Sequence, residues 1–164
     1  MTVCTSFWPP RTIITDVIEI RVALPGEVGA LEAVQMRASL ANPGDRDAIL
    51  AHPDAVSIPL EQFTNGWVFA AVDDDQVIGF AAVFPRADGD WELDGLFVEP
   101  TVWRSGVGRQ LVEYAATFTA IAGSSALHVI GNPHAEAFYH ACGFTTVGAG
   151  DTRFGPSILM RLVV

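Results

Sequence analysis

The sequence from Glu92 to Arg109, ELDGLFVEPTVWRSGVGR, predicts a strand that leads through a glycine turn into a helix. Alternation along the strand places Glu92, Asp94, Leu96 and Val98 on one face and Leu93, Gly95 and Phe97 on the other. The turn from Arg104 to Arg109 supplies two glycines and two arginines where the helix begins. Because free N–H groups and the positive end of the dipole meet at a helix N-terminus, we expect a phosphate-binding site there.

The composition indicates one soluble domain with an acidic surface. A chain of 164 residues with 50% hydrophobic content can bury a single core. The net charge of -10, with no run among the nine Lys and Arg residues, argues against nucleic acid as a partner. A cationic substrate suits this charge, although acidic proteins commonly carry it for solubility alone.

The ends of the chain indicate a cytoplasmic protein. Cys4 and Cys142 are far apart and form no CxxC spacing, so neither a disulfide framework nor a zinc site is expected. Residues 1–15 lack the basic and apolar segments of a signal peptide, and no apolar run reaches the roughly 20 residues that span a membrane. We expect an N-terminal arm over residues 1–15 and a single domain over 16–164.

The first half of the chain predicts helices followed by an antiparallel meander. A strand over 17–22 precedes a helix over 25–40 and a short helix over 45–51. Residues 66–83 predict a hairpin, and 91–98 a further antiparallel strand. Three aspartates, Asp73 to Asp75, occupy the hairpin turn; a metal loop is the alternative interpretation, but a solvated turn is the commoner origin of such a cluster.

The second half predicts a parallel crossover. Apolar residues recur at helical spacing from Gly106 to Ala122, and residues 127–130 form a buried strand. A short helix over 135–142 and two strands, 144–147 and 157–164, follow, joined by a glycine-rich loop over 148–156. The expected fold is α/β of the α+β type, with a mixed, mostly antiparallel sheet and helices on both faces.

A second motif, Asn132 with Ala135, Phe138-Tyr139 and Gly143-Phe144, follows one helix and one strand after the glycine turn. With both motifs in this order, the chain from Val17 onward resembles the GCN5-related N-acetyltransferase (GNAT) superfamily. The resemblance implies that the turn binds the pyrophosphate of acetyl-CoA and that Asn132 contacts its pantetheine arm, whereas Asn132 could otherwise be a helix cap. The implied cofactor-binding residues are Phe97, Val98, Arg104, Ser105, Gly106, Val107, Gly108, Arg109 and Asn132. The chain departs from the family pattern at Trp103, where the family carries Arg or Gln.

Acetyl transfer to an amine requires a base, an oxyanion site and an acid. Glu92 is the first candidate for the base, from its place in the resembling histone-modifying members, and Asp94 could instead be the base or bind the charge of the substrate. The resemblance implies an oxyanion-binding N–H near Phe97 or Val98, and Gly95 supports a strand bulge there. Tyr139 is the candidate acid for the departing thiolate. Arg153 could meet a substrate carboxylate or be an ordinary surface arginine.

These observations predict an acetyl-CoA-dependent N-acetyltransferase that needs no metal. The acetyl group would pass directly to a primary amine of a small molecule or peptide, because no activated nucleophile is apparent for an acyl-enzyme. An acyl-CoA-binding regulatory module with little or no activity is the alternative, and a nucleotide-phosphate binder is a third. We expect no nucleic acid or membrane partner, and a homodimer through the last strand or the Phe7-Trp8 arm is plausible.

Overall fold

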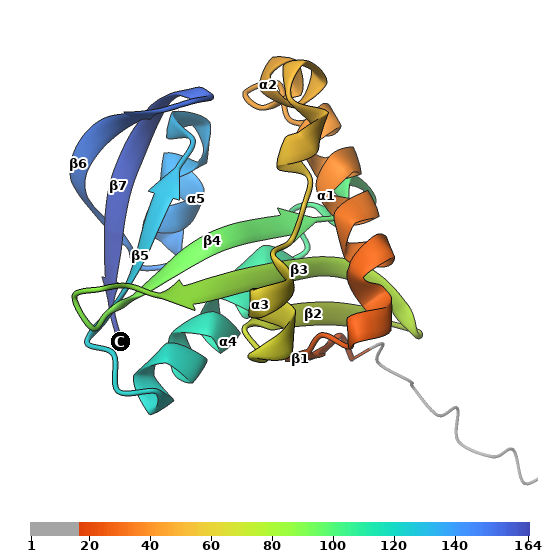
Figure 1. Cartoon of the computed structure of the whole chain (residues 1–164), viewed down its shortest axis with the longest axis horizontal. Helices are drawn as coiled ribbons and strands as arrows, with labels where there is room; N and C mark the ends of the chain where they lie inside the picture. Colours follow the sequence, from red (N-terminus) through yellow and green to blue (C-terminus); the bar gives the residue numbers. More distant parts are fainter. Residues whose placement is uncertain (1–16) are drawn as a thin grey trace, which may run out of the picture.

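The computed structural model describes residues 17–164, so the arm predicted for residues 1–15 lies outside the described residues. Within that range one mixed sheet has the strand order β1-β2-β3-β4-β5-β7-β6 (Figure 1). Only β4 and β5 pair in parallel; the other neighbours are antiparallel, which confirms the mostly antiparallel sheet. The strands are β1 (Glu19–Val22), β2 (Val68–Asp73), β3 (Gln76–Pro85), β4 (Trp91–Val98), β5 (Ala126–Gly131), β6 (Thr145–Thr152) and β7 (Gly155–Val163).

Helices cover both faces of the sheet, as expected (Figure 1). On one face, Leu31 of α1 and Phe63 of α3 join a buried cluster with Phe80 of β3. On the other face, Leu111 of α4 and Tyr139 of α5 join a larger cluster. The helices are α1 (Val28–Ala41), α2 (Arg46–Ala51), α3 (Leu60–Thr64), α4 (Val107–Ile121) and α5 (Glu136–Ala141), with 3-10 turns η1 (Pro25–Glu27), η2 (Pro53–Ala55), η3 (Pro100–Val102) and η4 (Pro133–Ala135).

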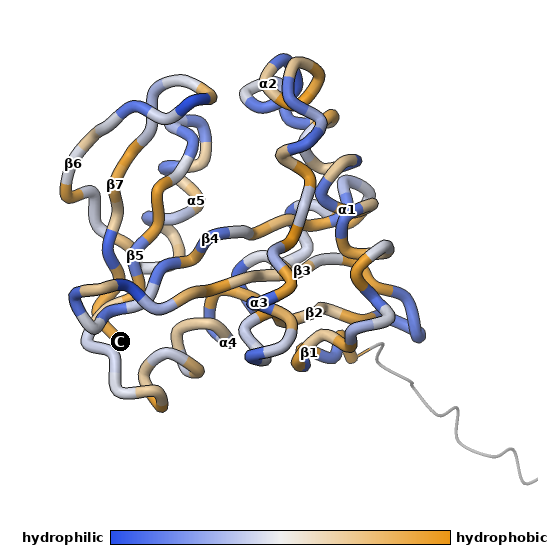
Figure 2. The backbone as a smooth tube through the Cα atoms, viewed as in Figure 1, coloured by the Kyte–Doolittle hydropathy of each residue, from blue (hydrophilic) through white to orange (hydrophobic). Residues whose placement is uncertain are grey.

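The central strands are apolar on both sides, and this is why the sheet has two covered faces. In β2, Phe69 packs in the cluster beneath α4 while its neighbour Val68 packs in the cluster beneath α1 and α3. Figure 2 shows hydrophobic residues along the central strands and hydrophilic residues at many of the turns. A fully buried side chain such as Phe69 contributes about 1.5–3 kcal/mol to folding. Among residues 17–164, no helix is both long and apolar enough to cross a membrane.

The β4 and β5 strands separate after a short parallel contact. Three residues of β4, from Trp91 to Leu93, pair with Leu127 to Val129 of β5, and the pairing ends there. Figure 1 shows the two strands diverging beyond this point. The edge of β4 that faces β5 therefore has no strand partner after Leu93, and its backbone groups on that side are open.

The β4 strand departs from the alternation predicted for residues 92–98. Leu93 and Gly95 pair with consecutive residues of β3, so Asp94 is the extra residue of a bulge. As a result Leu93 and Leu96 both pack in the cluster beneath α4, and the prediction that Leu96 shares its face with Glu92 and not with Leu93 is wrong. The bulge suggested by Gly95 is present.

Of the two turns predicted in the hairpins, the one at Asp74 and Asp75 is confirmed and the loop over 148–156 is not. Asp74 and Asp75 form the two-residue β2–β3 turn with φ angles of 47° and 63°, a conformation that aspartate tolerates, in agreement with a turn. The loop predicted over 148–156 is wrong, because β6 and β7 pair as far as Thr152 and Gly155. The β6 strand lies at the outer edge of the sheet, where no further strand within residues 17–164 packs its side chains against those of β6. Glycines weaken such a strand only modestly, so the β6–β7 hairpin extends through them.

Candidate functional site

A cavity of about 1270 Å³ occupies the space where β4 and β5 diverge. Its walls come from α1, the α2–α3 segment, β4, the N-terminus of α4, the end of β5, α5 and the β6–β7 turn, so every segment that carries a predicted site residue contributes to it. Of the predicted residues, the cavity is lined by Glu92, Asp94, Phe97, Val98, Arg104, Gly106, Val107, Gly108, Arg109, Asn132, Tyr139 and Arg153. Ser105 does not line it, and its hydroxyl donates to the carbonyl of Val102.

The glycine turn forms the N-terminus of α4. Gly106 is the N-cap residue, with φ 92° and ψ 0°, a left-handed conformation that favours glycine. The first backbone bond within the helix runs from Gln110 N–H to Gly106 C=O, so the N–H groups of Val107, Gly108 and Arg109 precede the helical ladder. Three amides at the positive end of a fifteen-residue helix thus offer hydrogen-bond donors to an anion at the cavity wall.

Trp103, the departure from the family pattern, braces this turn. Its indole N–H donates to the carbonyl of Val98 at 2.7 Å, which ties the loop after η3 to the end of β4. The indole is 43% exposed and lines the cavity. This hydrogen bond from Trp103 holds the loop, and the turn adopts its conformation without the arginine or glutamine of the family pattern.

Tyr139 lies at the floor of the cavity between apolar neighbours. Its ring packs against Phe138 and Phe144 with centroid distances of 5.2 and 5.4 Å. A Cβ placed on Gly131 would lie 3.2 Å from the Tyr139 ring, so the glycine gives the ring its place against β5. Burial raises the pKa of the Tyr139 phenol above its ordinary value.

Two carboxylates lie on the β4 wall, at and before the bulge. Glu92 is 14% exposed, and Arg86 lies 3.3 Å from it while also pairing with Asp88. Burial raises the pKa of the Glu92 carboxyl, and Asp94 adds to that rise while Arg86 opposes it. Asp94 is exposed and accepts a hydrogen bond from Gln62 at 3.0 Å.

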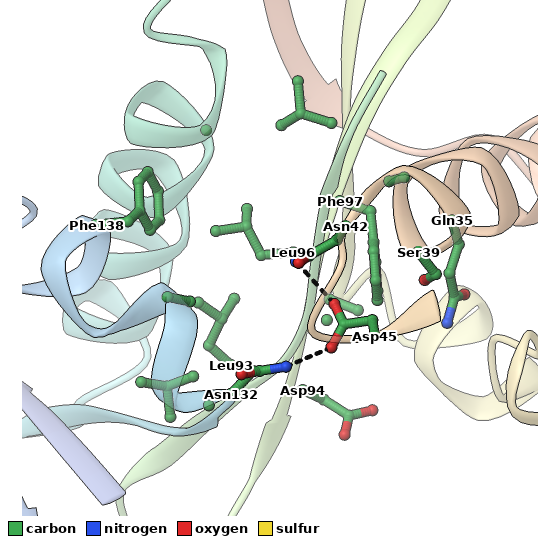
Figure 3. Close-up of a pocket in the computed structure, with 18 of the residues that line it drawn as sticks. Gln35, Ser39, Asn42, Asp45, Leu93, Asp94, Leu96, Phe97, Asn132 and Phe138 are labelled. Carbon is green, nitrogen blue, oxygen red and sulfur yellow. Dashed lines mark hydrogen bonds between the residues drawn. The ribbon is translucent and has the colours of Figure 1, made fainter. Parts of the chain in front are cut away.

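Asn132 is held across the cavity by the loop between α1 and α2. Its Nδ2 donates to the Asp45 carboxylate at 2.6 Å, and Asn42 donates to the same carboxylate at 3.0 Å (Figure 3). Its Oδ1 accepts from the N–H of His134, which is the capping geometry of the alternative interpretation. The cap and a ligand contact are compatible, because the amide group also lines the cavity.

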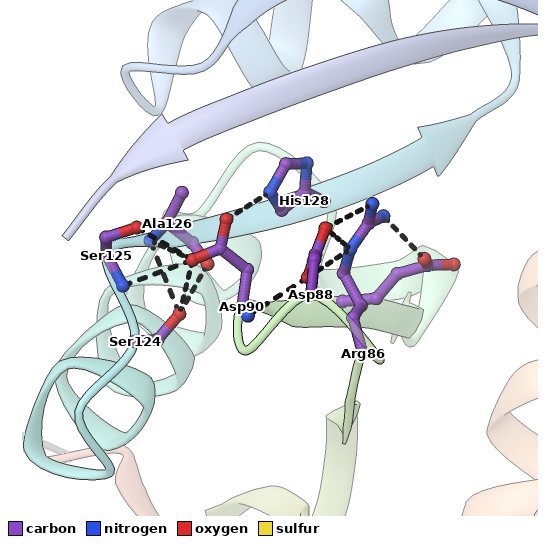
Figure 4. Close-up of polar contacts among 8 residues, drawn as sticks. Arg86, Asp88, Asp90, Ser124, Ser125, Ala126 and His128 are labelled. Carbon is purple, nitrogen blue, oxygen red and sulfur yellow. Dashed lines mark hydrogen bonds and ion pairs between the residues drawn. The ribbon is translucent and has the colours of Figure 1, made fainter.

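A second polar cluster connects the β3–β4 turn to β5 (Figure 4). The Asp90 carboxylate accepts from both the N–H and the hydroxyl of Ser125, from the N–H of Ala126, and contacts His128 Nε2 at 2.8 Å. These hydrogen bonds, His128 first, hold the pKa of the Asp90 carboxyl well below its usual range. Asp88, Asp90 and His128 could hold a cation by geometry, but their oxygens are engaged by Arg86, Ser125 and Ala126, which indicates a structural link.

Arg153 lies at the tip of the β6–β7 hairpin, over the mouth of the cavity. Its guanidinium is 3.8 Å from Asp54 and stacks at 4.5 Å on the ring of Phe154. Phe154 in turn meets His52 edge-on, so the hairpin tip reaches the segment between α2 and η2. Sequence reasoning missed Gln62 and Asp45, which line the cavity from helical segments without a recognisable motif.

Several solved structures share this fold. The PaiA N-acetyltransferase of Thermoplasma acidophilum, in complex with coenzyme A, matches with a TM-score of 0.72 at 18% identity, over 90% of this chain and 99% of that chain. An aminoglycoside 6'-N-acetyltransferase complexed with coenzyme A matches with a TM-score of 0.69 at 21% identity, over 88% and 96%. Ard1 from Thermoplasma volcanium matches with a TM-score of 0.70 at 16% identity, over 90% and 97%. At these identities the similarity establishes the fold.

The fold class is α/β, with a cleft between two diverging strands. In sequence, residues 64–146, just over half of the chain, match the acetyltransferase (GNAT) domain family. A search among curated proteins found no match. The chain therefore belongs to the GNAT family and is an N-acetyltransferase.

Proposed function

We propose that this protein transfers the acetyl group of acetyl-CoA directly to a primary amine of a small molecule or peptide, with residues 16–164 as one catalytic domain. One observation carries the proposal: a single cavity joins an anion site at the N-terminus of α4 to a pair of carboxylates on β4. An anionic cofactor and a cationic amine can therefore occupy opposite parts of the same space.

The cofactor part of the cavity suits a pyrophosphate followed by a polar, extended arm. The amides of Val107, Gly108 and Arg109 would hold the pyrophosphate, with Arg104 and Arg109 adding charge. The arm would lie between β4 and β5, where the open edge of β4 and the Asn132 amide offer hydrogen bonds. On this edge, an N–H of Phe97 or Val98 would face the thioester oxygen as negative charge develops on it.

Glu92 is proposed as the base that removes the proton from the acceptor ammonium. An alkylammonium has a pKa of about 10.4, so a carboxylate with a raised pKa is a better proton acceptor than a solvated one. The neutral nitrogen then forms a bond to the thioester carbon, the carbon–sulfur bond breaks, and the nitrogen loses its second proton as the departing sulfur gains one. The products are the N-acetylated amine and the free thiol of CoA.

Tyr139 is proposed as the acid that protonates the leaving sulfur. Its raised pKa keeps the phenol protonated through neutral and moderately alkaline pH. The same apolar surroundings destabilise a thiolate, so the sulfur is a ready acceptor of the phenolic proton. Phe138 and Phe144 hold the ring, and replacing Tyr139 by Phe would therefore remove the hydroxyl while keeping the packing.

A regulatory module that binds acetyl-CoA without turnover remains the second candidate, because Trp103 replaces the residue usual in the family. Incubation with acetyl-CoA and a panel of primary amines, monitored for free thiol, distinguishes the two. The enzyme predicts amine-dependent thiol release. Thermal stabilisation by acetyl-CoA without thiol release favours the module, stabilisation by ATP alone favours a nucleotide-phosphate binder, and no stabilisation by either contradicts all three.

A further inference from the structure

Within the described part of the chain, the cavity carries two carboxylates without cationic partners, those of Asp94 and Asp45. Asp94 accepts only from the neutral amide of Gln62, and Asp45 only from the amides of Asn42 and Asn132, among the residues from 17 to 164. Within that range no arginine lies within salt-bridge distance of either carboxylate. The Asp45 carboxylate is half-buried and the Asp94 carboxylate is exposed, and their negative charge, with no cation of the described residues beside it, attracts a positively charged ligand to this wall.

Gln62 provides an independent sign of a ligand at the same place. The residue is 5% exposed, it lines the cavity, and its Nε2 donates to Asp94 at 3.0 Å. Its Oε1 is buried and has no hydrogen-bond partner among the described residues. Because buried polar atoms are nearly always paired, an amide with one free acceptor beside Asp94 fits a donor group supplied by a ligand.

The reacting amine does not keep a positive charge beside Asp94 throughout the reaction. It must lose its proton before it attacks, and the proton passes to Glu92 under the proposed function. At that moment the nitrogen carries no charge, and the Asp94 side chain has no cation beside it. A second positive group on the acceptor would balance Asp94 before, during and after the transfer.

We propose that Asp94 and Gln62 form a subsite for a second ammonium group, so that the preferred acceptor is a diamine or longer polyamine. This inference rests on the proposed acetyl transfer. Asp94 accepts one N–H of the distal ammonium, and the Oε1 of Gln62 accepts another. The bulge that removes Asp94 from the regular alternation of β4 brings its carboxylate next to Gln62 of α3. Gln62 is thus also a positioning residue for Asp94.

The test compares α,ω-diamines of three to six carbons with monoamines of the same length. Thiol release gives kcat/KM for each pair, and calorimetric titration of the protein, free and with CoA, gives binding without turnover. We expect the best diamine to exceed its monoamine at least about tenfold in kcat/KM, equivalent to about 1.4 kcal/mol. Asp94→Asn and Gln62→Met should each reduce this ratio to within about threefold, since a hydrogen bond to a charged group typically contributes about this much.

Asp74→Asn is the matched control, because it removes one negative charge in the β2–β3 turn, outside the cavity, and asparagine accepts the same left-handed backbone. Its diamine-to-monoamine ratio should equal that of the unaltered protein. Equal turnover of diamines and monoamines, or an unchanged ratio in Asp94→Asn, would overturn the subsite while leaving acetyl transfer intact. If no thiol is released with either diamines or monoamines, the proposed function and the subsite are both overturned.

Discussion

Gly106→Ala tests whether the N-terminus of α4 binds the cofactor. Gly106 and Gly123 border the same helix, with φ angles of 92° and 88°, and a Cβ on either would meet nothing within 4 Å. Alanine at such a φ costs about 1–2 kcal/mol, whichever end of the helix carries it. For a chain of this size each kcal/mol lowers Tm by about 2–4 °C, so both variants should lose about 2–8 °C.

Only the Gly106 variant should lose affinity for acetyl-CoA, because only Gly106 lines the cavity. Any relaxation of the strained turn moves the amides of Val107 and Gly108, and loss of one hydrogen bond to a charged group costs about 1.5–3 kcal/mol, or about ten- to a hundredfold in Kd. Calorimetry of both variants with acetyl-CoA, beside their melting curves, measures this. If Gly106→Ala and Gly123→Ala bind acetyl-CoA equally well, the assignment of the pyrophosphate site to this turn is wrong.

Four further substitutions probe the rest of the cavity. Tyr139→Phe should lower kcat about 10²–10⁴-fold with Tm and the Kd for acetyl-CoA unchanged, measured by thiol release and calorimetry, and an unaltered kcat would exclude the phenol as the acid. Because burial raises the pKa of the Glu92 carboxyl, this base becomes protonated at a higher pH than a solvated glutamate does. We therefore expect kcat/KM to fall as the pH drops through that pKa. If the Glu92→Gln variant shows the same fall of kcat/KM on the acidic side of its pH–rate profile, the base lies elsewhere. Asn132→Ala should weaken the binding of acetyl-CoA several-fold in a titration. Asp45→Ala should strengthen this binding, because the substitution frees the Asn132 amide and removes a negative charge. Weaker binding in Asp45→Ala would mean that the contact between Asp45 and Asn132 supports the cofactor site.

Short-range patterns allowed much of the fold to be predicted. Period-two and helical spacings located the strands and helices, and the Asp-rich turn and the glycines that border α4 located their ends. The bulge at Asp94 was suggested by Gly95, yet its effect on the facing of Leu96 was missed because a single inserted residue reverses the alternation that follows it. The β6–β7 hairpin was underestimated since backbone pairing, rather than side-chain pattern, extends it through the glycines.

The cavity was predicted less completely. The residues of the two motifs line it, because each motif follows a strand whose end the sheet topology brings to the cleft. Gln62 and Asp45 enter through contacts 32 and 87 residues apart in sequence, and no local pattern announces such partners. The same holds for Trp103, whose indole bond to Val98 explains how the chain departs from the family pattern and still forms the turn.

The central claim is that cofactor and amine occupy one continuous cavity together and that the acetyl group passes between them directly. Initial rates of thiol release, with acetyl-CoA and a diamine varied against each other, test this most directly. The chain contains no lysine, so acetylation of its own lysines cannot obscure the rates. A shared cavity predicts double-reciprocal lines that intersect; parallel lines, with an acetylated form of the protein detected by mass spectrometry in the absence of amine, would contradict it.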